Sequence, residues 1–280
     1  MKRIAVVGTS NTLNPIRAEQ VIQVAGGIYP LGTLEIVFHP QCFTSAGHFA
    51  GTDEARAGAF LEMANDPAFD AIWFARGGYG AGRLLEHVLP HLNKAARKKT
   101  YMGYSDATAT LAGLYGHGIG RPVWGPMPVD VGRREVGPVI IEQALRFLVD
   151  NDGSYIDPAV RDTNAPVIAA NLSVWCSIMG TKWEPQVEGH VLFLEDVGEQ
   201  MYRLDRMMFQ LTERLKMRGL KGIRVGQFTD IPPNEPDFGM GIDEMMAYWS
   251  RRSGIPVLGS SMIGHSATNR IVPFGRYRQI

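Results

Sequence analysis

The order of apolar and polar positions changes regularly along the first half of the chain. Short apolar runs have the length of buried strands. Between them, apolar residues recur every three or four positions, which is typical of amphipathic helices. The expected strands lie at 3–8, 34–40, 70–78, 100–105 and 121–126, and the expected helices at 17–27, 53–66, 80–97, 107–118 and 139–152. Strands that alternate with helices predict βαβ units and therefore a parallel sheet.

The pattern changes after residue 150. Residues 151–166 are polar and rich in turn-forming residues, so we expect a linker there. Beyond the linker, strands are expected at 190–196 and 223–230, helices at 202–219 and 243–254, and a strand with a long loop at 256–275. The sequence thus predicts an α/β protein, with an N-terminal parallel-sheet α/β domain over 1–150 and a smaller mixed α/β C-terminal domain over 167–280.

Composition and charge exclude several classes of protein. The 280 residues include 28 Lys and Arg and 28 Asp and Glu, so no basic surface for nucleic acid is expected. Cys42 and Cys176 are far apart in the sequence, which argues against a disulfide framework or a zinc–thiolate site. The N-terminal apolar run is too short for the core of a signal peptide, and no later run is long enough to span a membrane. We therefore expect a soluble, cytoplasmic protein.

A serine stands where an expected strand meets an expected helix, in the sequence Gly103-Tyr104-Ser105-Asp106-Ala107. Small residues two positions before and after Ser105 leave room for a tight turn that presents the hydroxyl, as in the G-x-S-x-G nucleophile elbow of hydrolases. Alternatively, Ser105 or Asp106 caps the helix N-terminus, as serine and aspartate commonly do. On this segment alone the capping role is favoured.

A glycine-rich loop follows the neighbouring expected strand. Residues 75–82, ARGGYGAG, leave backbone N–H groups uncovered, so an oxygen can approach them. Because the carboxyl ends of parallel strands meet at one edge of a sheet, this loop and Ser105 can share a crevice. The loop can supply an oxyanion hole, cradle a phosphate or form a plain tight turn. A dinucleotide-binding G-x-G-x-x-G motif would need glycine at position 83, where Arg83 stands.

A serine nucleophile also needs a base, and the base needs a carboxylate to orient it. His265 lies in an expected loop of small and polar residues, where it is either an accessible base or an ordinary loop residue. Glu195 ends an apolar strand, where an orienting role and a capping or surface role are equally consistent. His87 and His91 are four residues apart, but Pro90 and the lack of an intervening acid argue against a metal site.

These segments resemble the LD-carboxypeptidases, the serine peptidases of family S66, which also include the microcin-immunity peptidases. The resemblance covers nearly the whole chain. It is carried by ARGGYGAGRLL, GYSDATATL, NLSVWCSIMGT, VLFLEDVGEQMYRLDRMMFQL, GIRVGQFTD and GHSATNRIVPFG, in this order. The resemblance implies a Ser-His-Glu triad, with Ser105 of the GYSD segment as the nucleophile. Glu195 of the LED segment and His265 of the last segment would complete it.

The resemblance also implies the reaction. The enzyme would cut the L,D-amide bond that joins a terminal D-alanine to a muropeptide tetrapeptide in the cytoplasm, without a cofactor or a metal. Backbone N–H groups of Gly78 and Asp106 would form the oxyanion hole, with Gly77 as the less favoured second donor. The expected partner is thus a peptide and neither nucleic acid nor a membrane, and a homodimer is expected because family members are often dimers. Three arginines are candidates for binding the terminal carboxylate: Arg203, Arg206 and Arg270.

Two other functions remain open. A microcin-immunity peptidase would use the same triad to deacylate an aminoacyl nucleotide. Its adenine would stack on an aromatic side chain, for which Trp124, Trp175 and Trp183 are candidates, although each is an equally good core residue. A non-catalytic module would instead bind a small anion with residues 76–80, RGGYG.

Overall fold

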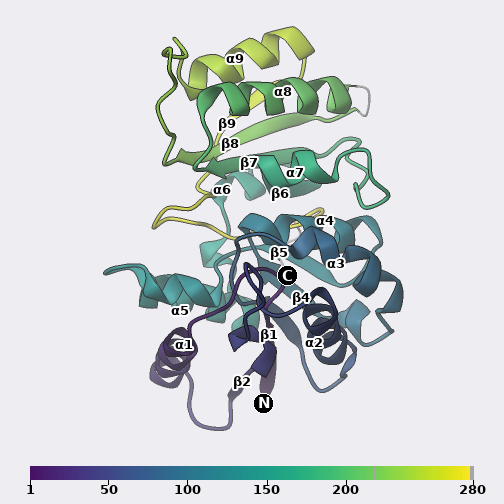
Figure 1. Ribbon diagram of the computed structural model, residues 1–280, viewed down its shortest axis with the longest axis vertical. Coiled ribbons are helices and arrows are strands. Elements are labelled where there is room, and N and C mark those ends of the chain that lie inside the picture. Colours follow the sequence, from purple (N-terminus) through teal and green to yellow (C-terminus); the bar gives the residue numbers. More distant parts are fainter. Residues whose placement is uncertain (217–218, 278–280) are drawn as a thin grey trace.

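Two β-sheets, one above the other in Figure 1, organise the protein. The computed structural model describes residues 1–216 and 219–277, and both sheets lie within them. The larger sheet comes mainly from the N-terminal half of the chain and the smaller sheet from the C-terminal half, and helices flank each. The predicted class, α/β with a parallel N-terminal sheet and a smaller second unit, is confirmed.

The larger sheet has six strands with helices on both sides. The strands span Lys2–Val7 (β1), Leu34–Phe38 (β2), Ala71–Phe74 (β3), Thr100–Gly103 (β4), Arg121–Trp124 (β5) and Val272–Pro273 (β10), and the helices Pro15–Ile28 (α1), Asp53–Asn65 (α2), Ala81–Val88 (α3), Thr108–Gly116 (α4) and Gly137–Asp150 (α5). The strand order is β10-β5-β4-β3-β1-β2, and all neighbours are parallel except β10, which pairs antiparallel with β5. Helices α2, α3 and α4 follow one another on one side, and α1 packs with α5 on the other (Figure 1).

The helix expected over 80–97 is shorter in the structure. It ends at Val88, and two short 3-10 turns follow, Leu89–His91 (η2) and Ala96–Lys98 (η3). Pro90 is the physical reason, because proline has no N–H to donate and its ring clashes with the preceding helical turn. The other helices and strands expected in this half lie within a few residues of their predicted bounds.

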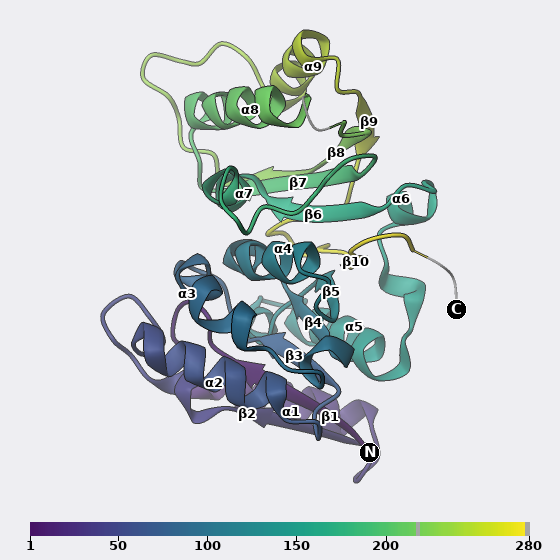
Figure 2. The same ribbon diagram turned by 90° about the vertical axis from the view of Figure 1, so that its right-hand side faces the viewer.

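The smaller sheet has four parallel strands in the order β6-β7-β8-β9 (Figure 2). The strands are Val167–Asn171 (β6), Val191–Val197 (β7), Gly222–Thr229 (β8) and Val257–Ser260 (β9), and the helices in this half are Pro158–Arg161 (α6), Leu172–Ile178 (α7), Met201–Lys216 (α8) and Ile242–Ser253 (α9). The helix expected over 202–219 corresponds to α8, and residues 217–218 lie outside the described residues.

Strand β6 and helix α7 are absent from the sequence-based prediction. Residues 167–178 form one largely apolar segment, in which neither the strand period nor the helix period can be recognised. The boundary is set by Asn171, whose side chain accepts a hydrogen bond from the N–H of Val174 at 3.1 Å and so caps α7. A capping residue therefore divides a continuous apolar run into two elements.

The segment before and after β10 returns from the smaller sheet to the larger one. Isolated bridges join Ile271 to Ile156 and Gly275 to Val167, and β10 itself pairs with β5. The yellow chain in Figure 2 accordingly runs between the two sheets. The loop between β9 and β10 thus begins on the smaller sheet and ends on the larger.

Both sheets have buried strands. Every residue of β3, β4 and β6 is buried, as expected for parallel strands covered on both faces. Trp73, Trp124 and Trp175 are fully buried side chains of the core. No helix among the described residues is both long and apolar enough to cross a membrane.

Candidate active site

Ser105 lies in a strained turn between β4 and α4. Its φ angle of 58° is in the left-handed region, which residues other than glycine rarely adopt. The turn is also crowded: a Cβ atom on Gly103 would lie 2.8 Å from Phe74 and 3.0 Å from Ala107. A serine with positive φ between a strand and a helix has the local geometry of a nucleophile elbow. Small neighbours are therefore required by space.

The glycine-rich loop after β3 lies directly against Ser105. A Cβ atom on Gly77 would lie 2.9 Å from Ser105 Oγ, so only glycine fits there without a shift. At Gly78, where φ is 124°, a Cβ atom would lie 2.3 Å from Oδ1 of Asn11. That oxygen accepts the N–H of Tyr79 at 3.3 Å, whereas the N–H of Gly78 has no hydrogen-bond partner among the described residues. The loop thus keeps one backbone donor unused near the serine.

Asp106 ties three strand ends together. Its buried carboxylate accepts hydrogen bonds from Oγ of Ser10, which follows β1, at 2.5 Å, and from the N–H of Ala81, the first residue of α3, at 2.9 Å. Burial raises the pKa of this carboxyl, and the two hydrogen bonds oppose that effect. Because the side chain bonds to other elements, it does not cap its own helix. The side chain instead holds the glycine-rich loop beside the serine turn.

A buried arginine supports the same loop. Arg56 of α2 is fully buried and donates to the carbonyl oxygen of Gly80 at 3.0 Å and to that of Thr9. It is paired with Asp53, which also binds Arg83. The loop backbone is therefore anchored by a charged group as well as by Asp106.

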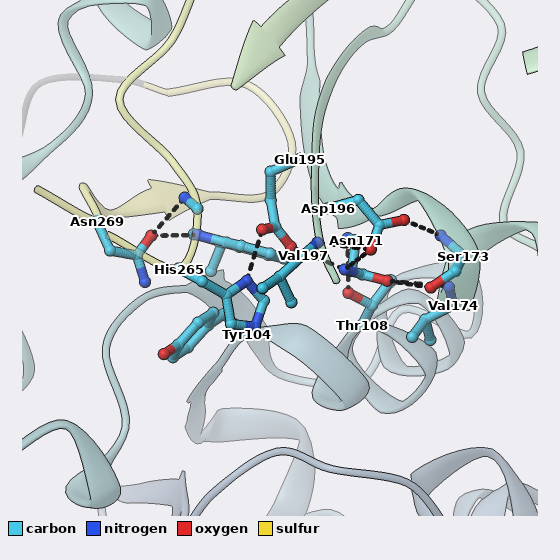
Figure 3. A network of polar contacts seen from close by, with 12 residues as sticks. Tyr104, Thr108, Asn171, Ser173, Val174, Glu195, Asp196, Val197, His265 and Asn269 are labelled. Carbon is cyan, nitrogen blue, oxygen red and sulfur yellow. Dashed lines mark hydrogen bonds and ion pairs between the residues drawn. The ribbon is translucent and has the colours of Figure 1, made fainter. Parts of the chain in front are cut away.

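Glu195 and His265 meet at the carboxyl end of β7 (Figure 3). Nδ1 of His265 lies 2.7 Å from Oε2 of Glu195, and the glutamate side chain is fully buried, whereas that of His265 is 17% exposed. The other carboxylate oxygen accepts a hydrogen bond from Nδ2 of Asn171 at 3.1 Å, from the register-matched position of β6. Both oxygens of the glutamate are thus occupied, which fixes its orientation toward the imidazole.

Asp196 extends this polar network. One of its oxygens accepts hydrogen bonds from Nδ2 of Asn171 at 2.9 Å and from the N–H of Val197 at 2.8 Å, and the other accepts the N–H of Ser173 at 2.9 Å (Figure 3). Burial raises the pKa of the Asp196 carboxyl to about 6, and the charge of Glu195 adds to the increase. The amide of Asn171 therefore serves both carboxylates. Sequence reasoning missed this role, for which the only signal was a capping residue after an apolar run.

A second cluster holds the ring and backbone of His265. Its ring packs against that of Tyr104, with 5.0 Å between the centroids. Arg133 donates to the carbonyl oxygen of His265 and, at 2.9 Å, to the hydroxyl of Tyr104. Asp130 accepts hydrogen bonds from Tyr104 at 2.8 Å and from Arg133 at 2.7 Å. Because Tyr104 immediately precedes Ser105, this cluster brings the histidine loop to the end of β4.

The three predicted catalytic residues thus lie in one region, but hydrogen bonds do not connect all of them. Glu195 and His265 are hydrogen-bonded, and His265 contacts the residue next to Ser105. Within the described parts of the chain, no hydrogen bond links Ser105 to His265. Catalytic hydrogen bonds are often long before substrate binds and tighten in the complex.

Two of the arginine candidates have contacts with neighbouring side chains of α8 or just before it. Among residues 1–216 and 219–277, no group of three potential ligands could hold a metal ion. Arg203 pairs with Glu199 at 2.9 Å, and Arg206 lies over the ring of Tyr202 at 5.2 Å. Neither arginine is directed by these contacts toward Ser105.

Asp157 anchors the loop that carries His265. Its carboxylate accepts hydrogen bonds from Oγ of Ser261 at 2.8 Å, from the N–H of Met262 at 2.6 Å and from the N–H of Ala159 at 2.9 Å. The residue is 1% exposed. Since Ser261 and Met262 follow β9, this contact from the expected linker fixes the start of the loop. No sequence pattern indicated it.

We expect Asp157→Ala to lower the free energy of unfolding by about 2–4 kcal/mol, because three donors lose their buried acceptor. The loss should also slow the reaction of Ser105 with a fluorophosphonate, because the histidine loop loses its anchor. Thermal unfolding and the labelling rate measure the two effects. The exposed Asp162→Ala is the matched control. Equal behaviour of the two variants would contradict the anchoring role.

Known proteins share both the sequence and the fold. The murein tetrapeptide carboxypeptidase of Pseudomonas aeruginosa is 28% identical over 242 residues, covering 82% of this chain and 78% of that protein. The crystal structure of muramoyltetrapeptide carboxypeptidase from Oxalobacter formigenes superposes with a TM-score of 0.79 at 24% identity, over 97% and 93% of the two chains. The microcin C7 self-immunity protein MccF, solved with aspartyl sulfamoyl adenosine, gives 0.74 at 19% identity, over 98% and 91%.

Two domain families match successive parts of the sequence. The N-terminal domain of LD-carboxypeptidases matches residues 4–121, and their C-terminal domain matches residues 164–280. The first match contains Ser105, and the second contains Glu195 and His265. The order of the two matched domains agrees with the order of the two sheets along the chain. The chain therefore belongs to the LD-carboxypeptidase family, S66.

Proposed function

We propose that the protein is a serine LD-carboxypeptidase with the catalytic triad Ser105, His265 and Glu195. The observation that carries the proposal is the 2.7 Å contact between Nδ1 of His265 and the fully buried carboxylate of Glu195. Its counterpart is the positive φ angle of Ser105, which presents the hydroxyl at the turn after β4. A buried carboxylate bonded to an imidazole is the orienting pair of serine hydrolases.

The mechanism follows from these hydrogen bonds. An ionised carboxylate only accepts hydrogen bonds, so Nδ1 of His265 carries a proton and Nε2 is the basic nitrogen. As Oγ of Ser105 attacks the amide carbonyl, Nε2 takes the hydroxyl proton and Glu195 stabilises the imidazolium. His265 then gives that proton to the leaving amine, and water hydrolyses the acyl-enzyme with the histidine again acting as the base.

The proposed oxyanion hole consists of the backbone N–H groups of Gly78 and Asp106. The N–H of Gly78 has no partner among the described residues, and that of Asp106 lies in the first helical turn, where no intrahelical acceptor is available. Such a donor typically contributes about 3 kcal/mol of transition-state stabilisation. Gly77 is less suitable because it packs directly against Ser105 Oγ.

The proposed substrate is a murein tetrapeptide with a terminal D-alanine. Relatives named murein tetrapeptide carboxypeptidase and muramoyltetrapeptide carboxypeptidase support this choice. The protein would act in peptidoglycan recycling in the cytoplasm, as a homodimer and without a cofactor or a metal. We also propose the division into domains over 1–150 and 167–280, joined by the linker 151–166.

We expect the enzyme to release D-alanine from L-Ala-D-Glu-meso-diaminopimelate-D-Ala and to act at least about 100-fold more slowly on the same peptide ending in L-alanine. Inverting the terminal centre moves its carboxylate, and a displacement of about 1 Å at the carbonyl can reduce the rate a hundredfold. Free alanine is measured by chromatography. Ser105→Ala is the control for contaminating activity. Comparable cleavage of both peptides would reject the L,D specificity while leaving the triad open.

One alternative substrate is supported by a particular observation. The chain shares its fold with MccF, which was solved with aspartyl sulfamoyl adenosine. Of the aromatic candidates for stacking on an adenine, however, Trp124 and Trp175 are fully buried in the core. Trp183 is half-buried and packs against His117 at 5.3 Å. Turnover of an aminoacyl sulfamoyl adenosine, without turnover of the tetrapeptide, would favour this alternative.

A non-catalytic anion-binding module is the alternative of another class. It would use the glycine-rich loop, and the contact between Glu195 and His265 would have no chemical role. Covalent labelling by a fluorophosphonate, located on Ser105 by peptide mass spectrometry, would exclude it. A protein that does not react with the reagent and does not cleave the tetrapeptide would support it.

A further inference from the structure

We propose that the protein has a second ligand site, for an organic anion with an aromatic or other apolar part. A cavity of about 740 Å³ lies at the edge of the larger sheet. Thr100 and Arg121, the first residues of β4 and β5, line it, whereas Ser105 lies two residues beyond Gly103, the last residue of β4. The cavity is therefore at the opposite end of these strands from the proposed active site. Its volume is in the range of small-molecule sites.

Three parts of the chain form most of the cavity, and Thr100 and Tyr115 complete it. The three parts are the start of β5, the end of α5 with the following residues up to Arg161, and the segment from Pro273 to Tyr277. The bridge between Ile156 and Ile271 holds the second and third parts together. In Figure 2 these parts, around α5, α6 and the chain after β10, lie on the same side of the molecule. Backbone pairing thus connects two of the segments that line the cavity.

The apolar part of the lining is mainly aromatic. Tyr115, Phe147 and Phe274 contribute rings, and Val123 and Ile156 contribute aliphatic surface. The rings of Tyr115 and Phe274 are edge to face, with 5.8 Å between the centroids. The hydroxyl of Tyr115 is held by Nε2 of His190 at 2.8 Å. A flat apolar group of a ligand can pack against such fixed rings.

The charged part of the lining is mainly basic, because it contains Arg121, Arg161 and Arg276 against one acid, Asp152. None of these three guanidinium groups forms an ion pair with a carboxylate in the described parts of the chain, although the protein is neutral overall. Unpaired guanidinium groups beside a cavity favour a carboxylate or a phosphate.

Two of the arginines are also held in place. Arg161 donates to the carbonyl oxygen of Gly153 and Arg276 to that of Asn164. A guanidinium group has five N–H donors, so each retains others for a ligand. Fixed cations beside fixed rings are the complement of a molecule that joins an anionic group to an apolar one. The inference is independent of the proposed hydrolysis, because it concerns the other end of the sheet.

The test is calorimetric titration of the full chain with 1-naphthyl phosphate, an aromatic anion. Inorganic phosphate and 1-naphthol, each of which has only half of the required chemistry, should bind at least about tenfold more weakly than the joined probe. Arg121→Ala should weaken binding about tenfold without loss of fold, since no hydrogen bond or ion pair of the described residues uses this side chain. Arg161→Ala, which also removes the hydrogen bond to the carbonyl oxygen of Gly153, should weaken binding to a similar extent. Arg251→Ala, an exposed arginine of α9, is the matched control and should bind as the unmodified protein does.

The inference fails if 1-naphthyl phosphate gives no binding heat at millimolar concentration. It also fails if the Arg121 and Arg161 variants bind as tightly as the Arg251 variant, because the probe would then lie elsewhere. Equal affinity for 1-naphthol would show an apolar site without charge recognition, which is likewise a rejection. The titration requires no turnover, so none of these results bears on the proposed peptidase activity.

Discussion

Ser105→Ala is expected to lower kcat/KM for the tetrapeptide at least about 1,000-fold, because the nucleophile is lost while the oxyanion donors remain. The melting temperature should hardly change, since alanine at this position keeps the same positive φ angle. Ser105→Gly should be equally inactive but more stable by about 1 kcal/mol, because glycine adopts this φ without strain. Rates by chromatography and stability by thermal unfolding give both readouts.

A double variant tests whether the residues act as a unit. Ser105→Ala/His265→Ala should be little slower than either single variant, because a base without its nucleophile has no proton to take. If the two losses instead multiply, the histidine has a separate function. Substantial activity in His265→Ala would reject the proposed base outright.

Glu195→Gln should reduce kcat/KM by about 1,000-fold or more, through the orientation of the imidazole. The carboxylate accepts a hydrogen bond on each oxygen, from Nδ1 of His265 and from Nδ2 of Asn171. An amide can accept on only one side. If its NH₂ group faces the histidine, Nδ1 must accept and the proton lies on Nε2, which is then no longer basic. If the NH₂ group faces Asn171, two N–H donors point at each other without an acceptor.

Stability and rate together distinguish this effect from simple unfolding. The variant is expected to fold, and Glu213→Gln, an exposed position on α8, is the control that should keep full activity. A Glu195→Gln enzyme that retains more than about a tenth of the activity would show that the histidine is oriented in another way. A protein that fails to fold would be replaced in the test by Glu195→Asp, which keeps two acceptor oxygens but shortens the reach.

The local features of the fold could be predicted from the sequence. Alternation of apolar runs located the five parallel strands of the larger sheet, and the crowded turn at Ser105 was visible as two small residues around a serine. Where apolar residues follow one another without polar positions at regular intervals, the pattern does not distinguish a strand from a helix. Residues 167–178 are largely apolar, so strand β6 and helix α7 could not be separated without the cap at Asn171.

Contacts between distant segments could not be predicted. The hydrogen bond from Ser261 to Asp157 spans 104 positions, and neither residue type is unusual in a loop. The same holds for Arg133, which reaches the backbone of His265. The packing of the two sheets determines which of these polar groups meet. Apolar periodicity predicts helices and strands but not which polar groups come into contact. For the same reason, the proposed triad was predicted from the resemblance to a family and not from apolar periodicity.

The return of β10 to the larger sheet sets the order of events during translation. Five strands of that sheet, with Ser105 at its turn, leave the ribosome before any residue of the histidine loop. Until the histidine loop and β10 emerge, the nascent sheet has an open edge at β5 and lacks the proposed base. A nascent chain that lacks the histidine loop therefore lacks the proposed base, and β10, which closes that edge, follows His265 in the sequence.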